Sequence, residues 1–300
     1  MLEAASCRRG MMNGSLRQCG PLLMKTAATS RLHRIEGRHN SHLKELRQAF
    51  SRAERTASGA CAIEGVHILE EAIRSGLRLE AVFFSESAEN RAGRLLPQIA
   101  NNVETWLVPD PLFSTAVPSE SPQGVAALVR MKEFSVDEVI DSSRRGPLLA
   151  VAGLQDPGNL GTILRSGEAF GVGGVLVGDN SVNLLNWKVV RASAGSIFRV
   201  PAARCRFKEI IPMLHDKGVR LLATSSHKGT PVYEQDWSQP AAVFIGAEGA
   251  GLAREIVSKV DSMISIPHSP RVESLNAGIA ASIVLYEAAR KRQQTPTTDT

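Results

Sequence analysis

From residue 147 onward, short runs of consecutive apolar residues alternate with segments of helical character. The runs are PLLAVAGL, GGVLVG, VRLLATSS, AAVFIGAE and SMISIPH. A strand that is apolar at consecutive positions is buried on both faces, and alternation with helices is typical of a parallel sheet covered on both sides. Residues 147–292 are therefore predicted to form one α/β domain, in which ligands bind beyond the carboxyl ends of the strands.

A smaller α/β pattern precedes this domain. Leu43, Leu46 and Phe50 share one face of a predicted helix that begins at Ser41. A short strand, a turn at Gly65 and another helix follow, and LEAVFFS, VETWLVP and QGVAALVR predict three further strands. The predicted organisation is a flexible basic leader (1–39), the smaller α/β domain (40–130), a charged and Ser-rich linker (131–146), the larger α/β domain (147–292) and a disordered polar tail (293–300).

Positive charge is concentrated near the start of the chain. Residues 1–52 hold ten Lys or Arg and three Asp or Glu, whereas the rest of the chain holds 25 and 27. A basic segment on a nearly neutral body suits a polyanionic partner such as RNA, and it fits a solubilising leader equally well. The first 30 residues have two further interpretations, a transit peptide and an extension upstream of a translation start at Met24.

Cysteine content and hydropathy narrow the class of protein. The four cysteines form no CxxC or CxxH pair, which argues against structural zinc or a disulfide scaffold and predicts a reducing, cytoplasmic location. No apolar run reaches the roughly 18–20 residues that span a bilayer, so no membrane association is expected. No His, Asp or Glu set has metal-ligand spacing, and His227 and His268 are expected to be loop residues.

The first unusual cluster, DPGNLGTILR, follows the strand at PLLAVAGL. Asp156 and Pro157 are expected to end the strand, and Asn159 to cap the next helix. Arg165 lies within the first two turns of that helix. It is either a surface arginine on a well-capped helix or a guanidinium positioned for a phosphate or a developing oxyanion.

The second cluster, FIGAEGAGLAREI, follows the strand at AAVFIGAE. Gly246, Gly249 and Gly251 leave room for a ligand against the backbone. Their spacing is not the dinucleotide fingerprint GxGxxG, and no GK[ST] follows, which excludes a P-loop. Glu248 either faces the ligand or stabilises the start of the following helix through its dipole.

The third cluster, ISIPHSPRVESLNAGIAASIVLYEAARKR, follows the last predicted strand. Ser274 or Asn276 is expected to cap a long helix. Helical spacing predicts a core-facing stripe made of Leu275, Ile279, Ile283 and Tyr286. Another side of this helix is narrow because its residues are small, which suits close packing on the sheet or a contact with a second subunit. These residues are Ala277, Gly278, Ala280, Ala281 and Ser282.

Taken together, the three clusters resemble the three motifs of the SpoU family of RNA ribose 2′-O-methyltransferases, in the SPOUT superfamily. The motifs occur in order as N-x-G-x-x-x-R, G-x-E-G-x-G and I-P followed by V-E-S-L-N, each after a predicted strand. The resemblance covers about residues 147–292. Residues 40–130 resemble, less closely, the L30e-like substrate-binding domain that often precedes it.

The resemblance implies a SPOUT-type parallel sheet with a C-terminal trefoil knot, a homodimer, and S-adenosyl-L-methionine bound in the knot without a metal. It implies that the cofactor lies against the backbone of Gly246, Ile266 and Leu275, with Thr224 as a further candidate. It also implies that Arg165 is the catalytic arginine and that the other polar positions of the site are Asn159, Glu248, Ser274 and Asn276. Arginine normally stays protonated, so we favour Arg165 as an orienting and charge-stabilising group, with a role as base left open.

Only 5% of the residues are aromatic, which disfavours a stacking platform for single strands and favours folded RNA. The predicted substrate is 23S ribosomal RNA, with transfer RNA as the alternative. The predicted phosphate contacts are Lys44, Arg47, Arg52 and Arg55, against the alternative that they form a solvated helix face. Two other functions stay open: a catalytically silent SpoU-like RNA-binding protein, and a methyltransferase that modifies a base.

Overall fold

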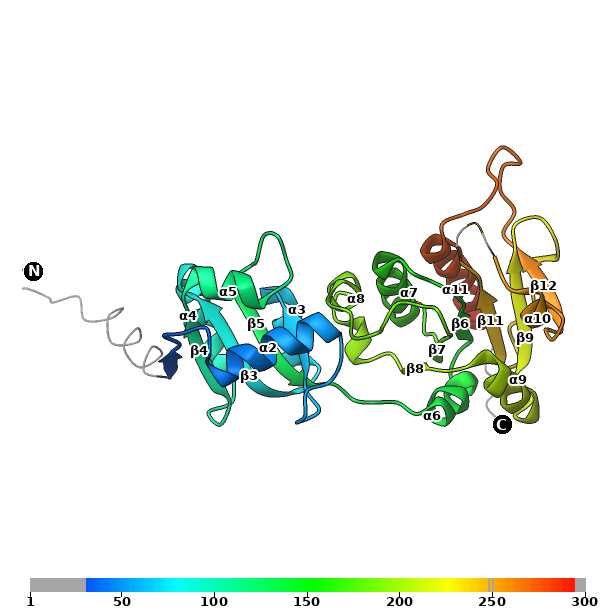
Figure 1. Ribbon diagram of the computed structural model, residues 1–300. Coiled ribbons are helices and arrows are strands. Elements are labelled where there is room, and N and C mark those ends of the chain that lie inside the picture. The colour runs from blue at the N-terminus through cyan, green and yellow to red at the C-terminus, as the bar shows by residue number, and fades with distance from the viewer. Residues whose placement is uncertain (1–30, 248, 250, 295–300) are drawn as a thin grey trace, which may run out of the picture.

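The computed structural model describes residues 31–247, 249 and 251–294. The chain forms two α/β units that lie side by side along the long axis of the molecule (Figure 1). Among the described residues, no helix combines the length and the apolar character needed to cross a membrane. The masked positions include Glu248, so this predicted site residue lies outside the described residues.

The N-terminal unit is a five-stranded mixed sheet with strand order β1-β4-β3-β5-β2. Its strands are β1 (Leu32–Arg34), β2 (Cys61–Glu64), β3 (Arg78–Ser85), β4 (Glu104–Val108) and β5 (Val125–Arg130). Its helices are α2 (Ser41–Arg52), α3 (Val66–Arg74), α4 (Glu89–Leu95) and α5 (Asp110–Ala116), with 3₁₀ turns η1 (Glu86–Ala88) and η2 (Leu96–Gln98). The helix and strands predicted for residues 40–130 are all present.

The N-terminal sheet begins earlier than the predicted boundary at residue 40. Strand β1 pairs in parallel with β4, and Ile35, directly after it, is 1% exposed. The sequence pattern does not predict this strand, because β1 is only three residues long and carries His33 and Arg34, so it shows no apolar run. Backbone pairing with a longer neighbouring strand holds it in place, and residue pattern alone does not reveal such pairing.

The C-terminal unit is a seven-stranded parallel sheet with strand order β10-β12-β9-β11-β6-β7-β8. Its strands are β6 (Leu148–Val151), β7 (Gly174–Val177), β8 (Ala202–Arg204), β9 (Arg220–Ser225), β10 (Thr230–Pro231), β11 (Ala241–Ile245) and β12 (Ser262–Ser265). Its helices, with the 3₁₀ turns η3 and η4, are α6 (Val136–Asp141), η3 (Ser142–Arg144), α7 (Pro157–Ala169), α8 (Trp187–Ala192), η4 (Ser196–Phe198), α9 (Phe207–Asp216), α10 (Arg254–Val257) and α11 (Ala277–Gln294). The predicted parallel α/β architecture is confirmed.

Alternate residues of the central strands pack against opposite helical layers, as the continuous apolar runs predicted. Leu149 and Val151 of β6 belong to the core cluster that contains α7, α8 and α11. Leu148 and Ala150 belong to the cluster that contains α6 and α9. The predicted linker therefore contributes α6 to one covering layer of the sheet.

Helix α11 packs differently from the predicted stripe. Its buried residues are mostly small and are Ala277, Gly278, Ala281, Val284, Leu285 and Ala288. Ile279 is 53% exposed and Tyr286 is 50% exposed, so assigning them to the core was wrong. The error has a physical reason: close packing on α7 selects small residues, and the larger apolar side chains are left on the opposite side of the helix.

Candidate functional site

A cavity of about 330 Å³ lies beyond the carboxyl ends of β9, β11 and β12, where the open-sheet rule places a ligand. Loops after these strands and the start of α11 line it. The lining residues are Thr224, Ser225, Ser226, Ile245, Gly246, Ala247, Gly249, Gly251, Leu252, Ile264, Ile266, His268, Glu273, Ser274, Leu275, Ala277 and Ala280. The second and third sequence clusters therefore meet at one cavity.

All four predicted cofactor-binding residues line this cavity. Thr224 donates its hydroxyl proton to the Phe244 carbonyl at 3.2 Å, which ties β9 to β11 at the cavity edge. Gly246 leaves no space for a side chain, because a Cβ there would lie 2.3 Å from the Gly251 carbonyl carbon. A glycine is therefore required for this loop to fold back on itself.

The cavity suits a ligand with an apolar and a polar part. Ile245, Leu252 and Ile264 provide apolar surface, while Ser225 and Glu273 provide polar side chains. Its volume falls in the range typical of small-molecule sites. These features fit the adenine ring and the amino-acid portion of S-adenosylmethionine.

The first cluster joins the third through side-chain amides. Asn276 donates from Nδ2 to Asn159 Oδ1 at 2.9 Å, although the two residues lie 117 positions apart. Asn276 also caps α11, since its Oδ1 accepts from the Ile279 N–H at 3.1 Å. The prediction that Asn159 caps α7 was wrong: Asp156 is the cap and accepts from the Gly158 N–H at 3.0 Å, while Asn159 is a buried residue inside the helix.

Arg165 lies on α7 and is exposed. It makes no hydrogen bond or ion pair with any residue in the described part of the chain, and it does not line the cavity. Its neighbour Ser166 contacts Ser282 of α11 through their hydroxyls at 2.6 Å, which fixes the packing of this turn of α7. The Arg165 guanidinium is thus carried by a firmly packed helix and is open to an external partner. Ser274 is also exposed and lines the cavity.

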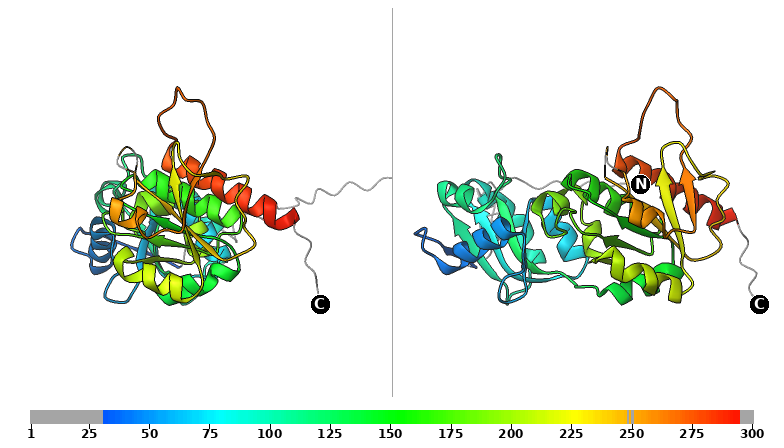
Figure 2. Two further views of the ribbon diagram at one scale, coloured as in Figure 1. Left: turned by 90° about the vertical axis from the view of Figure 1, so that its right-hand side faces the viewer. Right: turned by 45° about the vertical axis from the view of Figure 1, so that its right-hand side comes forward.

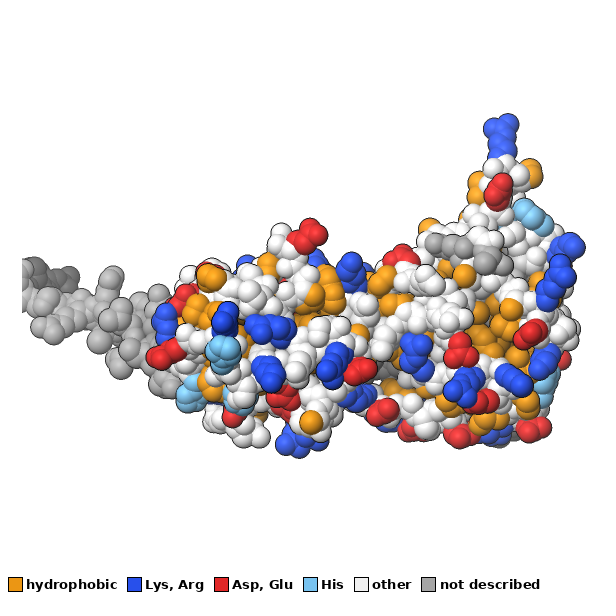
Figure 3. Space-filling view, in the orientation of Figure 1, with side chains coloured by type: hydrophobic (Ala, Val, Ile, Leu, Met, Phe, Trp, Pro, Cys, Tyr) orange, Lys and Arg blue, Asp and Glu red, His pale blue; other side chains and the backbone are white. Residues whose placement is uncertain are grey.

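The four predicted phosphate contacts separate into two pairs. Lys44 and Arg52 are exposed on α2. Arg47 donates to the carbonyl and hydroxyl of Thr115, both at 3.1 Å. Arg55 donates to the Met131 carbonyl at 3.0 Å and pairs with Glu133, so Arg47 and Arg55 already hold parts of the domain together. On the face seen in Figure 3, Lys and Arg side chains are interspersed with acidic ones over both units.

His268 is a cavity residue that sequence reasoning missed. Its Nδ1 lies 2.6 Å from the Ile266 carbonyl oxygen, and its buried Nε2 has no hydrogen-bond partner among the described residues. Its ring lies 5.7 Å from that of His227. Its place directly after the I-P pair was the available signal. The described residues contain no group of three or more His, Cys, Asp and Glu placed to hold a metal ion.

Comparison with known proteins identifies the family. Residues 147–286 match the SpoU rRNA Methylase family, and residues 40–127 match the MRM3-like substrate binding domain. The 23S rRNA (guanosine(2553)-2′-O)-methyltransferase RlmP of Bacillus subtilis is 30% identical over 256 residues, covering 85% of this chain and 98% of that protein. The chain belongs to the SpoU family. This SpoU protein is an RNA ribose 2′-O-methyltransferase that uses S-adenosylmethionine, as the motifs implied.

Solved structures agree with the SpoU assignment. A crystal structure titled as an RNA 2′-O ribose methyltransferase aligns with a TM-score of 0.74 at 29% identity, covering 87% of this chain and 100% of that one. The SpoU methyltransferase AviRb from Streptomyces viridochromogenes, in complex with AdoMet, aligns with a TM-score of 0.72 at 26% identity, covering 85% of this chain and 100% of that one. Both alignments span the two units of the SpoU chain.

Proposed function

We propose that this SpoU enzyme methylates a ribose 2′-hydroxyl of 23S ribosomal RNA. The observation that carries the proposal is the contact between Asn159 and Asn276, which brings the arginine helix to the edge of the cofactor cavity. The RlmP relative, a 23S rRNA methyltransferase, supports the choice of RNA. A cytoplasmic location stays a prediction.

In the proposed site, S-adenosylmethionine supplies an activated methyl group, and the chain positions the reacting oxygen. Arg165 orients the 2′-hydroxyl and stabilises the negative charge that develops on its oxygen. The proton leaves to solvent or to an RNA phosphate, since a guanidinium stays protonated.

Asn159 and Asn276 hold α7 against α11, and Glu248 and Ser274 complete the polar side of the site. Thr224, Gly246, Ile266 and Leu275 surround the cofactor.

The N-terminal unit is proposed to bind the substrate RNA, with Lys44 and Arg52 as phosphate contacts. Both side chains are exposed on α2, and residues 40–127 match a substrate-binding domain. Arg47 and Arg55 are proposed to contribute less, because carbonyl groups of the same unit already occupy their donors.

We further propose a homodimer formed through the outer face of α11. Ile279 and Tyr286 expose large apolar side chains there, and the Phe170 ring packs edge-on against Tyr286 at 5.7 Å. Such a surface suits burial against a second copy.

The loop from Ile266 to Asn276, which rises clear of the domain in Figure 2, is proposed to take part in the C-terminal knot.

Transfer of labelled methyl from S-adenosylmethionine to total RNA tests the function, with wild type compared to Arg165→Ala. Label recovered as a 2′-O-methylnucleoside in 23S rRNA, and lost in the variant, is the expected result. Label in transfer RNA would replace the proposed substrate, and label on a base would overturn the role of Arg165. Absence of cofactor binding in a calorimeter would favour a silent RNA-binding protein, whereas cofactor binding without transfer would mean that the RNA was offered in the wrong state.

A further inference from the structure

One face of the α8–η4 segment contacts the N-terminal unit at four positions spaced four residues apart. Trp187 packs against the core of the N-terminal unit. Arg191 lines a cavity with residues of α3. A Cβ at Gly195 would lie 2.6 Å from the Glu71 Cβ. Arg199 is the fourth position, and together they form a continuous contact between the two units.

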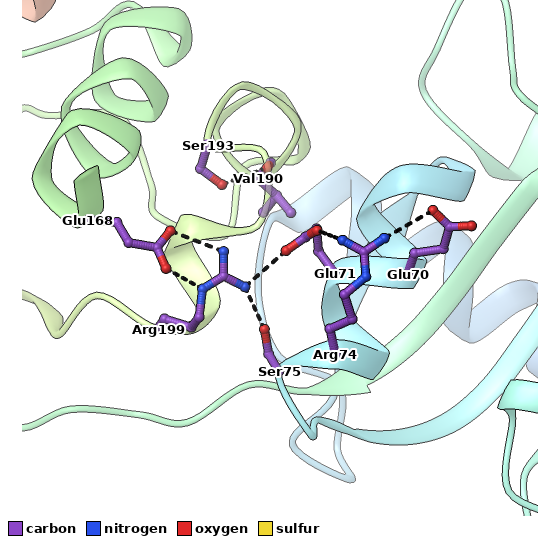
Figure 4. A network of polar contacts seen from close by, with 8 residues as sticks. All are labelled: Glu70, Glu71, Arg74, Ser75, Glu168, Val190, Ser193 and Arg199. Carbon is purple, nitrogen blue, oxygen red and sulfur yellow. Dashed lines mark hydrogen bonds and ion pairs between the residues drawn. The ribbon is translucent and has the colours of Figure 1, made fainter.

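Arg199 fastens this contact by bridging three side chains (Figure 4). It donates to Glu71 Oε2 at 3.0 Å and to Ser75 Oγ at 2.7 Å, both in the N-terminal unit. It also pairs through two nitrogens with Glu168 of α7. These charged hydrogen bonds therefore connect the end of α3 to α7 through Arg199.

A cavity of about 210 Å³ lies in the same contact, near Arg191. It is lined by Glu64, Gly65, His67, Ile68, Gln123 and Arg191, so both units contribute to it. His67, Gln123 and Arg191 are exposed, whereas Glu64 is 7% exposed. The cavity thus has an accessible polar rim and a buried carboxylate.

Only one of the two oxygens of the Glu64 carboxylate accepts a hydrogen bond from the described part of the protein. Oε1 accepts from the Gln123 N–H at 3.2 Å, but Oε2 is shielded from solvent and has no hydrogen-bond partner among the described residues. Burial raises the pKa of the Glu64 carboxyl, while the Gln123 N–H and the charge of Arg191 oppose the rise. A buried acceptor without a partner is unfavourable for folding, and an apolar side chain would avoid that cost. A ligand that donates hydrogen bonds to Oε2 would explain why a carboxylate is buried at this position.

The charges around the cavity favour a base with donors and acceptors on different edges. A carboxylate accepts from base amines, and an arginine donates to guanine O6 and N7. Guanine offers both: its N1–H and N2–H groups suit Glu64, and its O6 and N7 suit Arg191. In folded RNA, bases displaced from loops and bulges are recognised through these edges.

Building on the proposed RNA substrate, we propose that the cavity between α3 and α8 binds an unpaired guanine of that RNA, with Glu64 and Arg191 as its partners. The exposed Gln123 side chain lines the same cavity, and its Oε1 accepts from the Val66 N–H at 3.2 Å. His67 lines the rim beside it.

The position of the cavity separates this base from the methylated nucleotide. Helix α7 packs against α11, at the cofactor cavity, and against α8, at the guanine cavity. The two cavities share no lining residue, so a base in one and the cofactor in the other occupy separate sites. The guanine is therefore another nucleotide of the substrate, and its capture sets which ribose reaches Arg165.

The test compares Glu64→Gln with wild type on 23S rRNA transcripts that carry inosine at a fraction of guanosines. Inosine lacks the 2-amino group that Glu64 is proposed to accept from. For wild type we expect inosine at one guanosine to reduce methylation about tenfold, in line with the loss of a base contact. For Glu64→Gln we expect the Michaelis constant for unmodified RNA to rise about tenfold, and inosine at that position to cause no further loss. The turnover number and the cofactor affinity should not change.

Glu70→Gln is the matched control, since Glu70 lies on α3 but does not line the cavity. Arg191→Gln, at an exposed residue, provides a second variant if Glu64→Gln does not fold, and it should raise the Michaelis constant in the same way. An inosine profile identical in wild type and both cavity variants would overturn the proposal. If wild type methylates a different RNA, the proposed ribosomal substrate is wrong. The same comparison of variants on that RNA then tests whether the cavity binds guanine.

Discussion

At the residue scale, the active site depends on polar side chains that contact one another across long stretches of chain. Asn159 is buried inside α7, and its oxygen accepts from Asn276 at the start of α11. Ser166 and Ser282 make a parallel contact two turns further along. Each pair joins residues more than a hundred positions apart, so α7 and α11 are connected by side-chain hydrogen bonds at two points.

Asn159→Ala is predicted to destabilise the protein by about 1 kcal/mol, because it removes a buried hydrogen-bond acceptor. It should also lower the turnover number, since α7 carries Arg165. A double-mutant cycle with Asn276→Ala, measured by urea unfolding, should give a coupling energy of roughly 0.5 kcal/mol or more. Additive effects of the two substitutions would show that the pair does not interact in solution.

Cys205 is predicted to resist alkylation at pH 8 in the folded protein. Burial, together with the nearby negative charge of Asp179, raises the pKa of its thiol to about 12. The reactive thiolate is therefore scarce below that pH. Peptide-resolved mass spectrometry after iodoacetamide treatment should find Cys205 unmodified until denaturant is added. Rapid labelling of the native protein would contradict this assignment.

At the element scale, the packing of α7 against its neighbours leaves no space for larger side chains. A Cβ at Gly161 would lie 2.3 Å from the Ala192 Cβ and 2.8 Å from the Ala192 carbonyl carbon. A Cβ at Gly278 on α11 would make a tight contact, 3.2 Å from the Thr162 Cβ and 3.3 Å from the Asn159 Oδ1. Helix α7 is therefore held between α8 and α11 through glycine contacts.

Gly161→Ala is predicted to destabilise the protein by roughly 1–3 kcal/mol, because part of its neighbour is rigid backbone. Gly93→Ala is the control: Gly93 lies in α4, and nothing lies within 4 Å of the added carbon. That substitution should be neutral or stabilising by up to about 1 kcal/mol. Chemical denaturation of both variants checks the difference, and equal losses of stability would contradict the packing argument.

Ile279→Asp is predicted to convert the proposed homodimer to a monomer without unfolding it. The side chain is 53% exposed in the single chain, so a charge there costs little unless a second copy covers it. Sedimentation equilibrium measures the mass, and circular dichroism reports the fold. A wild-type protein that sediments as a monomer would exclude the dimer, and a variant that remains dimeric would place the interface elsewhere.

The elements differ in how far the sequence predicted them. Strands such as β6 and β11 are recognisable because burial on both faces makes every residue apolar. Strands β1 and β10 are not, because two or three residues carry no period. Helix α11 was recognised, but its orientation was wrong, because Ala and Gly give little hydrophobic contrast with the outer face. Of the residues that line the cavity, Gly246, Ile266 and Leu275 lie at motif positions, whereas His268 lies in the spacer between I-P and V-E-S-L-N, where the motif specifies no residue.

At the scale of the whole molecule, the two units share one apolar core cluster. Residues of α3 and β2 belong to the same cluster as residues of α7 and α8. The network around Arg199 adds polar contacts at the surface of this junction. A single sequence indicated two domains but not their contact, because interface residues such as Trp187 and Gly195 resemble ordinary core and turn residues.

The ion pair between Arg199 and Glu168, beside the junction, is predicted to weaken in acid. The hydrogen bond from Arg199 lowers the pKa of the Glu168 carboxyl below its usual 4.5. A carboxyl whose pKa is lower in the folded state stabilises that state fully above its unfolded pKa, and the contribution is lost as pH falls through the folded value. The urea midpoint of wild type should therefore fall more steeply below pH 4.5 than that of Arg199→Gln.

Arg206→Gln serves as the control for that comparison, because Arg206 pairs only with Glu209 on its own helix among the described residues. Its pH profile should follow wild type. Parallel profiles for wild type and Arg199→Gln would indicate that the ion pair between Arg199 and Glu168 contributes nothing to stability.

The pairing of α7 with α11 also has a consequence for protein synthesis. Helix α7 leaves the ribosome more than a hundred residues before α11, and the cap at Asn276 comes only with the latter. A nascent chain can therefore contain the arginine helix and the glycine loop and still lack a closed cofactor cavity. We therefore expect methyl transfer only from chains that have been translated through α11, and not from shorter nascent chains.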